Sequence, residues 1–581
     1  MAMVKHMNRA LSTFQPFTSN SDSGGPELKI ALVALPYEEG PQRIMPLGLQ
    51  NISAYIKKNI KQKKSIKIFD YSNLESSNTE QLEDLISWKP DLIGISIYSS
   101  HVCAAIHWGH TIQQSLPASF IFCGGPHISL AAEDFLIRSH PTFKLAIQGE
   151  GEYPTRILIE HFNTLPSLKN SIDYDNWAEQ IPNTVWINSK GKIKHSLDKK
   201  LQLPASEWEN PLMEYHSERL QNLYFTDRRD KKKRTAIALT SSRGCPLSCS
   251  FCAIVAADKE GPKWRAVEAE TLVAWIGEAL NSYDFQHIYI MDANFFVKKE
   301  RVLAFSRGLH KLRGGTLTWS SSSTVGYLLK IRHELPTLVL QGLRLVEMGI
   351  EAGSQSQLDY MNKRVSVQNN IDAIKALQQN NIDIGLDFIM FYHDQKKQEI
   401  IDNLIFLVSA GVTEHESFDH YFNIMMLYPR TPVRHNLENS IGEKLSLEKL
   451  PFSRDFIDNY DVKKIYSTFI DDFAKPWLGK LEAAISSNLR VLSQSKSKSL
   501  KAQLSLMNIY LRHMPFIVLW ELSHAKKHAP IEVIVPQFSN YTHLIESLLH
   551  RKDEATIARK IVEIGTTGVG GRSGELISKI S

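Results

Sequence analysis

The segment SSRGCPLSCSFC, residues 241–252, contains three of the five cysteines and decides which fold we expect for the second half of the chain. Cys245, Cys249 and Cys252 stand at positions i, i+4 and i+7, directly after the strand-like run AIALTSS. Three thiolates can hold three irons of a cubane 4Fe–4S cluster and leave the fourth iron without a protein ligand. Zinc would require a fourth ligand, and no second Cys-x-x-Cys pair occurs in the chain. The spacing therefore favours an iron–sulfur cluster with one open coordination position.

Strand-like and helical runs alternate from residue 235 to residue 440. Six such repeats predict a partial or complete parallel α/β barrel, and we expect a partial (β/α)6 barrel, with its site on the loops that follow the strands. The cysteine segment follows the first strand, so we expect it at the mouth of the barrel. The strand-like runs are AIALTSS, HIYIMDANFF, LTWSSS, RLVEMGIEAGS, NIDIGLDFIMFY and HYFNIMMLYPRTP.

A second α/β region precedes the barrel, at residues 28–165. Its β-rich runs LKIALVAL, SIKIFDY, DLIGISIY, SFIFCGG and KLAIQGEGE are separated by helical stretches. This pattern predicts a Rossmann-like, doubly wound parallel sheet, which binds ligands at the carboxyl ends of its strands. Gly124, Gly125, Gly149 and Gly151 stand at those ends, where they either let the backbone approach a ligand or form ordinary turns.

The other segments carry weaker signals. We expect a flexible leader at residues 1–27, without the apolar core of a signal peptide. We expect a linker at residues 166–234, in which the charge run DRRDKKKR forms a solvated loop, and a mostly helical C-terminal domain at residues 441–581 with one possible strand, IEVIVP. The chain contains 22% charged residues, a net charge of +5 and no apolar run long enough for a bilayer. Five cysteines in 581 residues indicate a reducing compartment, the cytoplasm, and neither a membrane nor a nucleic acid is an expected partner.

The cysteine segment RGCPLSCSFC resembles the signature of radical S-adenosylmethionine (SAM) enzymes, in which the open iron binds SAM. By this resemblance Phe251 borders the adenine, and Glu351, in the GIEAGS motif, approaches the ribose. KWRAVEAETLVAWIGEAL and LYPRTP are also similar to family segments. Where the family has a Gly-Gly-Glu motif, this chain has Asp292, Ala293 and Asn294, and we expect the first and last of these to contact SAM.

Residues 28–162 resemble the cobalamin-binding domain found upstream of the barrel in one large subclass of these enzymes. The resemblance implies cobalamin contacts from strand-end residues, namely Ser96, Tyr98, Gly124, Gly125, His127, Gly149 and Glu150. The loop PYEEGPQRIMPLG has no histidine to ligate cobalt, as is general in this subclass. A degenerate Rossmann-like domain that only shapes the substrate pocket is the alternative. A second cluster is not expected, since only Cys103 and Cys123 lie upstream.

Together these resemblances imply a cobalamin-dependent radical SAM enzyme, similar to the class B methyltransferases. It would transfer a methyl group from methylcobalamin to an unactivated carbon of a small-molecule or peptide natural product, and an external donor such as flavodoxin or ferredoxin would supply electrons. The same architecture also supports cyclisation, ring contraction or oxidation without methyl transfer. From another class, a binding or scaffold protein with a metal-stapled loop is the alternative. No catalytic acid or base can be identified from the sequence.

Overall fold

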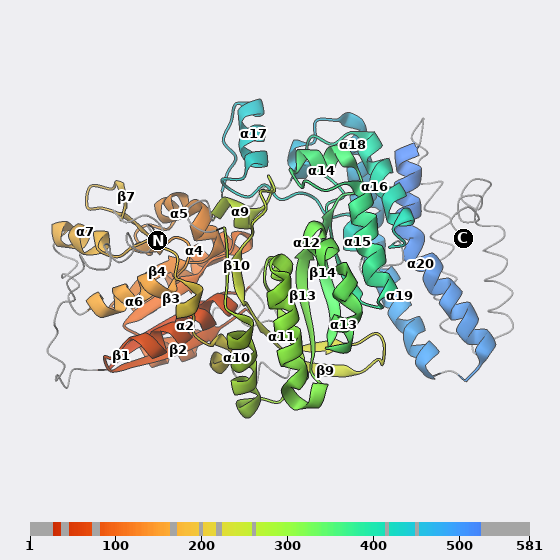
Figure 1. Ribbon diagram of the computed structural model, residues 1–581. Coiled ribbons are helices and arrows are strands. Elements are labelled where there is room, and N and C mark those ends of the chain that lie inside the picture. The colour runs from red at the N-terminus through yellow and green to blue at the C-terminus, as the bar shows by residue number, and fades with distance from the viewer. Residues whose placement is uncertain are drawn as a thin grey trace.

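The computed structural model of the chain contains two α/β sheets that lie side by side and a set of C-terminal helices (Figure 1). It describes residues 27–36, 46–72, 82–162, 171–196, 201–215, 223–257, 263–412, 418–447, 453–494 and 496–524. The leader, IEVIVP and the end of the chain lie outside these residues. Among the helices in these ranges, none combines the length and apolar character needed to cross a membrane.

The first sheet has the strand order β2-β1-β3-β4-β5-β6-β7. Strands β1 to β5 are parallel, as the alternating runs predict, and the order in which strands are added reverses between β1 and β3, where doubly wound sheets bind ligands. The elements are β1 (Leu28–Ala34), α2 (Leu47–Asn59), β2 (Lys64–Asp70), α3 (Glu83–Trp88), β3 (Leu92–Ser96), α4 (Val102–Ser115), β4 (Phe120–Gly124), α5 (Pro126–Ser139), β5 (Leu145–Ile147), α6 (Glu152–His161), α7 (Ser171–Glu179), β6 (Thr184–Ile187) and β7 (Ile193–His195).

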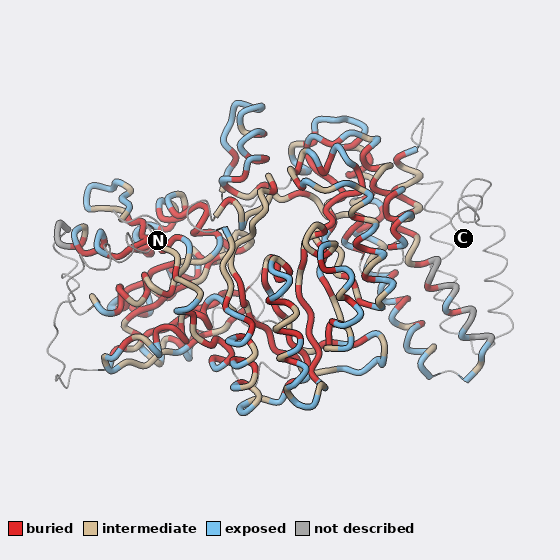
Figure 2. The backbone as a smooth tube through the Cα atoms, viewed as in Figure 1, coloured by how far each residue is buried: buried red, intermediate tan, exposed pale blue. Residues whose placement is uncertain are grey.

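Successive residues of β1 show why this sheet is covered on both faces. Ala31 and Val33 pack in one core cluster, whereas Ile30 and Leu32 pack in another. Because side chains alternate along a strand, an apolar run without polar alternation must bury both faces. Figure 2 shows these strands as buried tubes between more exposed helices.

Part of the segment predicted as a linker belongs to the first sheet. Strands β6 and β7 form an antiparallel hairpin, and β6 pairs antiparallel with β5. The hairpin caps the sheet edge, which lowers the exposure of unpaired backbone groups. Its strands have only four and three residues, too short for the sequence pattern to reveal.

The second sheet has the strand order β15-β14-β13-β12-β9-β8. Strands β9 and β12 to β15 are parallel, and the sixth predicted run forms only a parallel bridge between Phe391 and Ile424, so the barrel is partial. The elements are β8 (Tyr224–Thr226), β9 (Lys233–Leu239), α10 (Ala269–Ser282), β12 (His287–Ile290), α11 (Lys299–Lys311), β13 (Thr318–Thr324), α12 (Val325–Ile331), α13 (Leu335–Leu340), β14 (Leu343–Glu351), α14 (Gln355–Tyr360), α15 (Val367–Gln379), β15 (Asp383–Phe388) and α16 (Lys397–Ser409).

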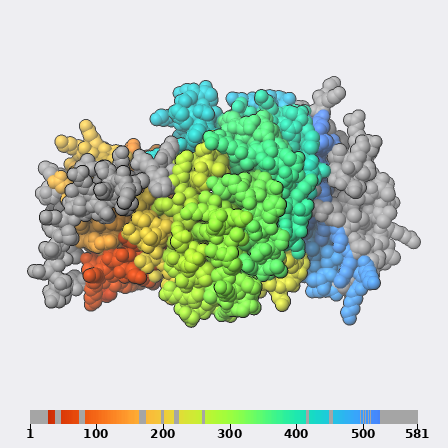
Figure 3. Space-filling view, viewed as in Figure 1, coloured from red at the N-terminus to blue at the C-terminus, as the bar shows by residue number. Residues whose placement is uncertain are grey.

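The C-terminal helices pack against the barrel instead of forming a separate core. Phe391 meets Tyr466 edge to face at 5.0 Å, and Phe516 and Leu519 belong to the same apolar cluster as the barrel strands. The helices are α17 (Pro432–Ile441), α18 (Tyr460–Ser467), a π-helix (Thr468–Ala474), α19 (Lys475–Gln494) and α20 (Lys498–His524). The space-filling view shows α20 at the far end of the molecule from the first sheet (Figure 3).

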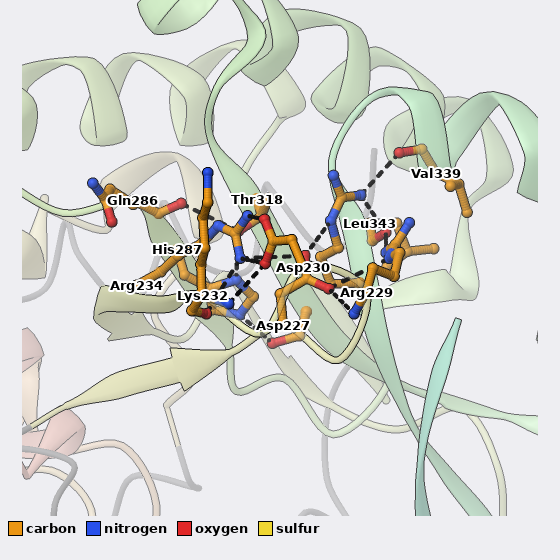
Figure 4. Close-up of polar contacts among 12 residues, drawn as sticks. Asp227, Arg229, Asp230, Lys232, Arg234, Gln286, His287, Thr318, Val339 and Leu343 are labelled. Atoms are coloured by element: carbon orange, nitrogen blue, oxygen red, sulfur yellow. Dashed lines mark hydrogen bonds and ion pairs between the residues drawn. The ribbon is translucent and has the colours of Figure 1, made fainter. Parts of the chain in front are cut away.

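The charge run DRRDKKKR is exposed at five of its eight residues, as predicted for a solvated loop, but its first residue is buried. It forms the turn between β8 and β9 and closes the amino-terminal end of the barrel (Figure 4). Asp227 is 2% exposed and accepts a 3.0 Å hydrogen bond from Arg344 Nε, while Arg234 Nη1 lies 3.3 Å from its Oδ2. Arg229 donates to the carbonyl of Leu343 at 2.9 Å. The negative charge of one buried carboxylate thus partly neutralises the positive charges of several arginines.

Replacing Asp227 with asparagine is expected to destabilise the barrel by about 3 kcal/mol, because arginines buried beside it lose their carboxylate. The midpoint of thermal unfolding, followed by circular dichroism, measures the loss. Asp230→Asn is the matched control, since Asp230 pairs with Arg234 at the exposed edge of the same turn. Equal midpoints for the two variants would contradict the importance of the buried carboxylate.

Candidate active site

The three cysteines lie in a loop that connects two short antiparallel strands, β10 (Ser242–Gly244) and β11 (Trp264–Ala266). The loop lies at the carboxyl end of β9 and begins at Gly244, whose φ of 79° glycine adopts readily. All three cysteines line one cavity of about 130 Å³. Its other walls are Leu247, Phe251, Ile254, Val255, Ala293, Ser322, Ser323, Thr324, Glu347, Gly349, Glu351, Lys363 and Asp387.

Hydrogen bonds from the turn after α14 hold the cysteine loop in place. Ser250 donates its backbone N–H to the carbonyl of Met361 at 2.9 Å and its hydroxyl to the carbonyl of Tyr360 at 3.0 Å. Asn362 Nδ2 donates to the carbonyl of Ser248 at 2.7 Å. Three hydrogen bonds to backbone carbonyls therefore hold the loop around Cys249 against the barrel.

The chemistry of the three thiols suits an iron–sulfur cluster. Within the described ranges, no group of three His, Cys, Asp or Glu side chains is arranged to hold one metal ion. A cubane cluster instead takes each thiolate on a different iron. Burial raises the pKa of Cys249 to about 11, although Lys363 acts to lower it. A free Cys249 thiol stays protonated at neutral pH, so binding of a metal centre must release its proton.

The predicted SAM contacts divide into two pairs. Phe251 and Glu351 line the cysteine cavity, whereas Asp292 and Asn294 do not. The Asp292 carboxylate accepts backbone and hydroxyl hydrogen bonds from Ser241 and Ser242 at 2.6 to 2.9 Å. Asn294 is fully buried and donates to Thr324 Oγ1 at 3.2 Å. Asp292 therefore anchors the strand that leads into the cysteine loop.

A buried ion pair adjoins the cysteines. Lys363 Nζ donates to Glu351 Oε1 at 2.7 Å, and the Lys363 side chain is only 4% exposed. Glu351 has a φ of 66° at an irregularity in the pairing of β14 with β15, which turns its side chain toward the lysine. Sequence reasoning missed Lys363, because no local pattern marks a lysine that becomes buried through folding.

Two further carboxylates face the cavity, Glu347 on β14 and Asp387 on β15. Burial raises the pKa of Asp387 to about 7, and the nearby charges of Glu351 and Glu347 add to this effect. Sequence reasoning missed both residues. The signal was the spacing of Glu347 and Glu351 in RLVEMGIE. They are four residues apart, so they lie on the same face of a strand whose other residues are mostly apolar.

A second cavity, of about 320 Å³, lies at the carboxyl ends of β1, β3 and β4. Its walls include six of the seven residues predicted to contact cobalamin, namely Ser96, Tyr98, Gly124, Gly125, Gly149 and Glu150. His127 does not line it, because its ring is 2% exposed and its Nδ1 lies 3.0 Å from Ser99 Oγ. The cavity lies where the strand order reverses, between β1 and β3, and this sheet topology places its ligand there.

Glycines shape this second cavity. Gly125 has a φ of 101°, and a Cβ there would lie 2.8 Å from the backbone nitrogen of Ile97. Gly48 and Gly149 have no atom within 4 Å of the position of a Cβ, so the cavity meets bare backbone at both residues. Such walls suit a broad ligand that approaches the main chain closely.

Strand β10 leads from one cavity to the other. Ser242 and Arg243 line the cavity of the first sheet, and Cys245, two residues further on, lines the cysteine cavity. The segment after the last barrel strand also bridges both regions, since Arg430 donates to the carbonyl of Ser129 at 3.3 Å and Val433 donates to the carbonyl of Ser250 at 3.2 Å. Ligands bound in the two cavities would therefore be close neighbours.

Comparison with known protein families identifies both regions. The Radical SAM superfamily model matches residues 239–407, and the B12 binding domain model matches residues 39–159. The chain is a cobalamin-dependent radical SAM enzyme. Its cofactors are a 4Fe–4S cluster, SAM and cobalamin. The donor set agrees with this assignment, since three cysteines share one cavity and a glycine-lined cavity adjoins it.

Relatives of the enzyme have different named activities. The hopanoid C-3 methylase of Methylococcus capsulatus is 26% identical over 60% of this chain and 61% of its own length. The 4′-phospho-dehydrooxetanocin synthase of Priestia megaterium is 24% identical over 64% of this chain and 49% of its own length. The matched region therefore spans about half to three fifths of these relatives.

A solved structure has a similar fold. The cobalamin-dependent SAM radical enzyme OxsB, solved with aqua-cobalamin and SAM, aligns with 99% of this chain and 88% of its own at a TM-score of 0.66 and 16% identity. At this identity the likeness establishes the arrangement of the domains in the enzyme, and its substrate has to be argued separately.

Replacing Gly48 with leucine is expected to lower cobalamin binding about 10-fold to 100-fold, because the side chain would project into the cavity of the first sheet. Corrinoid absorbance after anaerobic reconstitution measures the effect. Gly479→Leu is the control, since Gly479 is also a helical glycine without an atom near its Cβ position. Normal corrinoid content in Gly48→Leu would show that cobalamin binds elsewhere.

Proposed function

We propose that this enzyme transfers a methyl group from cobalamin to an unactivated carbon of a small-molecule or peptide natural product. The observation that supports this proposal is the closeness of the two cavities along the chain, since Arg243 lines one and Cys245, two residues further on, lines the other. Neighbouring cavities let two bound cofactors act on one substrate carbon, and such proximity lowers a reaction barrier substantially. The methylase among the relatives agrees with this reaction.

In this proposal, Cys245, Cys249 and Cys252 hold the cluster, and the other walls of their cavity hold SAM. The cluster and SAM supply hydrogen-atom abstraction, and cobalamin supplies the methyl group. The chain itself orients SAM with Glu351 and Lys363 and covers it with Phe251 and Ile254, which exclude water from a reactive site. The walls of the first-sheet cavity, including Ser96, Tyr98 and Gly149, hold cobalamin.

The proposed reaction also implies a cellular compartment and an electron donor. We place the enzyme in the cytoplasm, because a low cysteine content and an iron–sulfur cluster are both compatible with a reducing compartment. We assign an external flavodoxin or ferredoxin as the electron donor. We also retain the proposed division into a cobalamin-binding region, a barrel at residues 235–440 and a C-terminal helical region.

Product analysis without substrate tests the methyl-transfer proposal. The anaerobically reduced holoenzyme, supplied with SAM, is expected to release both S-adenosylhomocysteine, from methyl donation, and 5′-deoxyadenosine, from reductive cleavage. Gly48→Leu should suppress only the first product, and Cys249→Ala only the second. Release of 5′-deoxyadenosine alone by the wild-type enzyme would contradict methyl transfer and favour cyclisation, ring contraction or oxidation, in line with the synthase relative.

A further inference from the structure

The strands that carry the cysteine loop place two arginines directly opposite each other. In the antiparallel pair of β10 and β11, Arg243 is the register partner of Arg265. Like charges at opposed positions of a strand pair are destabilising unless a counter-charge lies between them. Both side chains are largely buried, with exposures of 17% and 10%, so water screens their repulsion poorly.

Two carboxylates from the first sheet domain supply the counter-charge. Glu150 accepts from Arg243 Nη1 at 3.1 Å and from Arg265 Nη1 at 3.3 Å, and it also contacts Arg265 Nη2. Glu152 pairs with the second terminal nitrogen of Arg243. We call these four residues the carboxylate clamp. Its two positive and two negative charges balance, although the acids and the arginines lie about 100 residues apart in sequence.

Further groups fix the geometry of the carboxylate clamp. The Arg243 guanidinium stacks over the ring of Trp208 at 4.2 Å from its centroid. The backbone N–H of Leu203 donates to Glu150 Oε2 at 3.1 Å, and the Leu203 carbonyl accepts from Arg265 Nη1 at 2.5 Å. Each charged group therefore has one defined arrangement, and charge-assisted, multidentate contacts of this kind are directional.

The position of the carboxylate clamp links the two cavities. Glu150, Glu152 and Arg243 line the cavity of the first sheet, and Arg243 is two residues from Cys245. Glu152 is also the first residue of α6, where the positive end of the helix dipole favours a carboxylate. The oxygens of Glu150 are thus engaged by the chain itself, which argues against the role of cobalamin ligand predicted from the sequence.

We propose that Glu150 and Glu152 are positioning residues, which hold the cysteine hairpin against the cobalamin-binding domain and so set the placement of the cluster relative to cobalt. This inference rests on the proposed function for its catalytic consequence, since methyl transfer requires both cofactors to reach one carbon. A displacement of about 1 Å between reacting groups can lower a rate on the order of 100-fold.

The test compares variants that cut the carboxylate clamp in different ways. Glu150→Gln leaves Arg265 without its carboxylate, and this uncompensated charge can impair folding. The double variant Glu150→Gln/Arg265→Gln removes one positive and one negative charge, so it keeps the charge balance while it releases β11. Glu160→Gln is the control, because Glu160 lies on α6 and pairs with Arg156 at the surface, outside both cavities.

Pulsed electron paramagnetic resonance provides the main readout. In frozen holoenzyme that contains cob(II)alamin and the reduced cluster, the dipolar coupling between the two spins reports their separation. The double variant is expected to bind iron and corrinoid as the wild type does, but with a shifted or broadened coupling. With substrate, methylated product should fall on the order of 100-fold, while 5′-deoxyadenosine continues to form.

Two results would overturn the proposal. A coupling identical to that of the wild type and the Glu160→Gln control would show that the carboxylate clamp does not set the placement of the cofactors. Loss of corrinoid from the double variant with normal iron content would identify Glu150 as a cobalamin ligand. The coupling needs no substrate, so it decides this inference even if the wild-type enzyme proves to transfer no methyl group.

Discussion

Cys249→Ala is expected to abolish the cluster and the reductive cleavage of SAM. Cys249 is the most buried of the three cysteines, and the cavity that they share has no other cysteine to replace it. Two thiolates cannot hold three irons of a cubane, so iron content should fall to background. The rate of 5′-deoxyadenosine formation should drop by more than the roughly 10-fold to 100-fold typical of losing a supporting residue around a metal site.

The control for this result is Cys103→Ala, which removes an exposed thiol outside both cavities. Iron analysis, the brown absorbance of the reconstituted protein and chromatography of the nucleoside products measure the effect. Full 5′-deoxyadenosine formation by Cys249→Ala would show that the three cysteines do not form the radical-generating site. Corrinoid binding should stay normal, because Cys249 does not line the cavity of the first sheet.

Lys363→Met is expected to be the second most damaging change. It leaves the Glu351 carboxylate without its 2.7 Å partner in a cavity that already contains Glu347 and Asp387. Breaking a buried ion pair in this way costs about 3 to 5 kcal/mol of folding free energy. In the wild type, the positive charge of Lys363 lowers the pKa of the Cys249 thiol. Loss of that charge should therefore oppose thiolate formation at Cys249. Iron incorporation and SAM cleavage should therefore both fall.

A double-mutant cycle separates the two effects of Lys363. Lys363→Met/Glu351→Gln restores the charge balance, so we expect it to recover most of the thermal stability but not the SAM cleavage. Lys475→Met provides the surface control, because the Lys475–Asp471 pair is more than half exposed and should contribute little. If the single and double variants are equally unstable, the ion pair with Glu351 is not the reason for the burial of Lys363.

Local patterns in the sequence were sufficient for the two parallel α/β regions and for the expectation that the three cysteines share one site. The runs of β1, β3 and β4 are mostly apolar because both faces are buried, and that signal depends only on neighbouring residues. Likewise, Cys245, Cys249 and Cys252 stand within one short loop, so their spacing alone indicates a shared metal centre.

Contacts between distant segments could not be predicted in this way. Asp292 lies at the end of a strand, where its sequence position suggests a ligand contact, but Ser241 and Ser242 come close enough in the folded chain to occupy its carboxylate. The same holds for Glu150, whose charge is neutralised by Arg265, 115 residues away in the sequence. Whether a carboxylate is free to bind a ligand depends on such partners, which only the tertiary structure brings together.

In the charge run, too, a contact with a distant segment could not be predicted from the sequence. Such runs are usually solvated, yet Asp227 becomes buried because β8 adds to the edge of the barrel next to Arg344. The predicted linker was partly wrong for a related reason. The strands β6 and β7 are short, and only their pairing with β5 makes them part of the sheet.

Cofactor content after anaerobic purification and reconstitution tests the central claim most directly. The claim is that one cavity of this chain holds the cluster with SAM and that the adjoining cavity holds cobalamin. We predict about four irons and a stoichiometric corrinoid per chain, with iron lost selectively in Cys249→Ala and corrinoid lost selectively in Gly48→Leu. A colourless protein that contains zinc and no corrinoid would contradict the account.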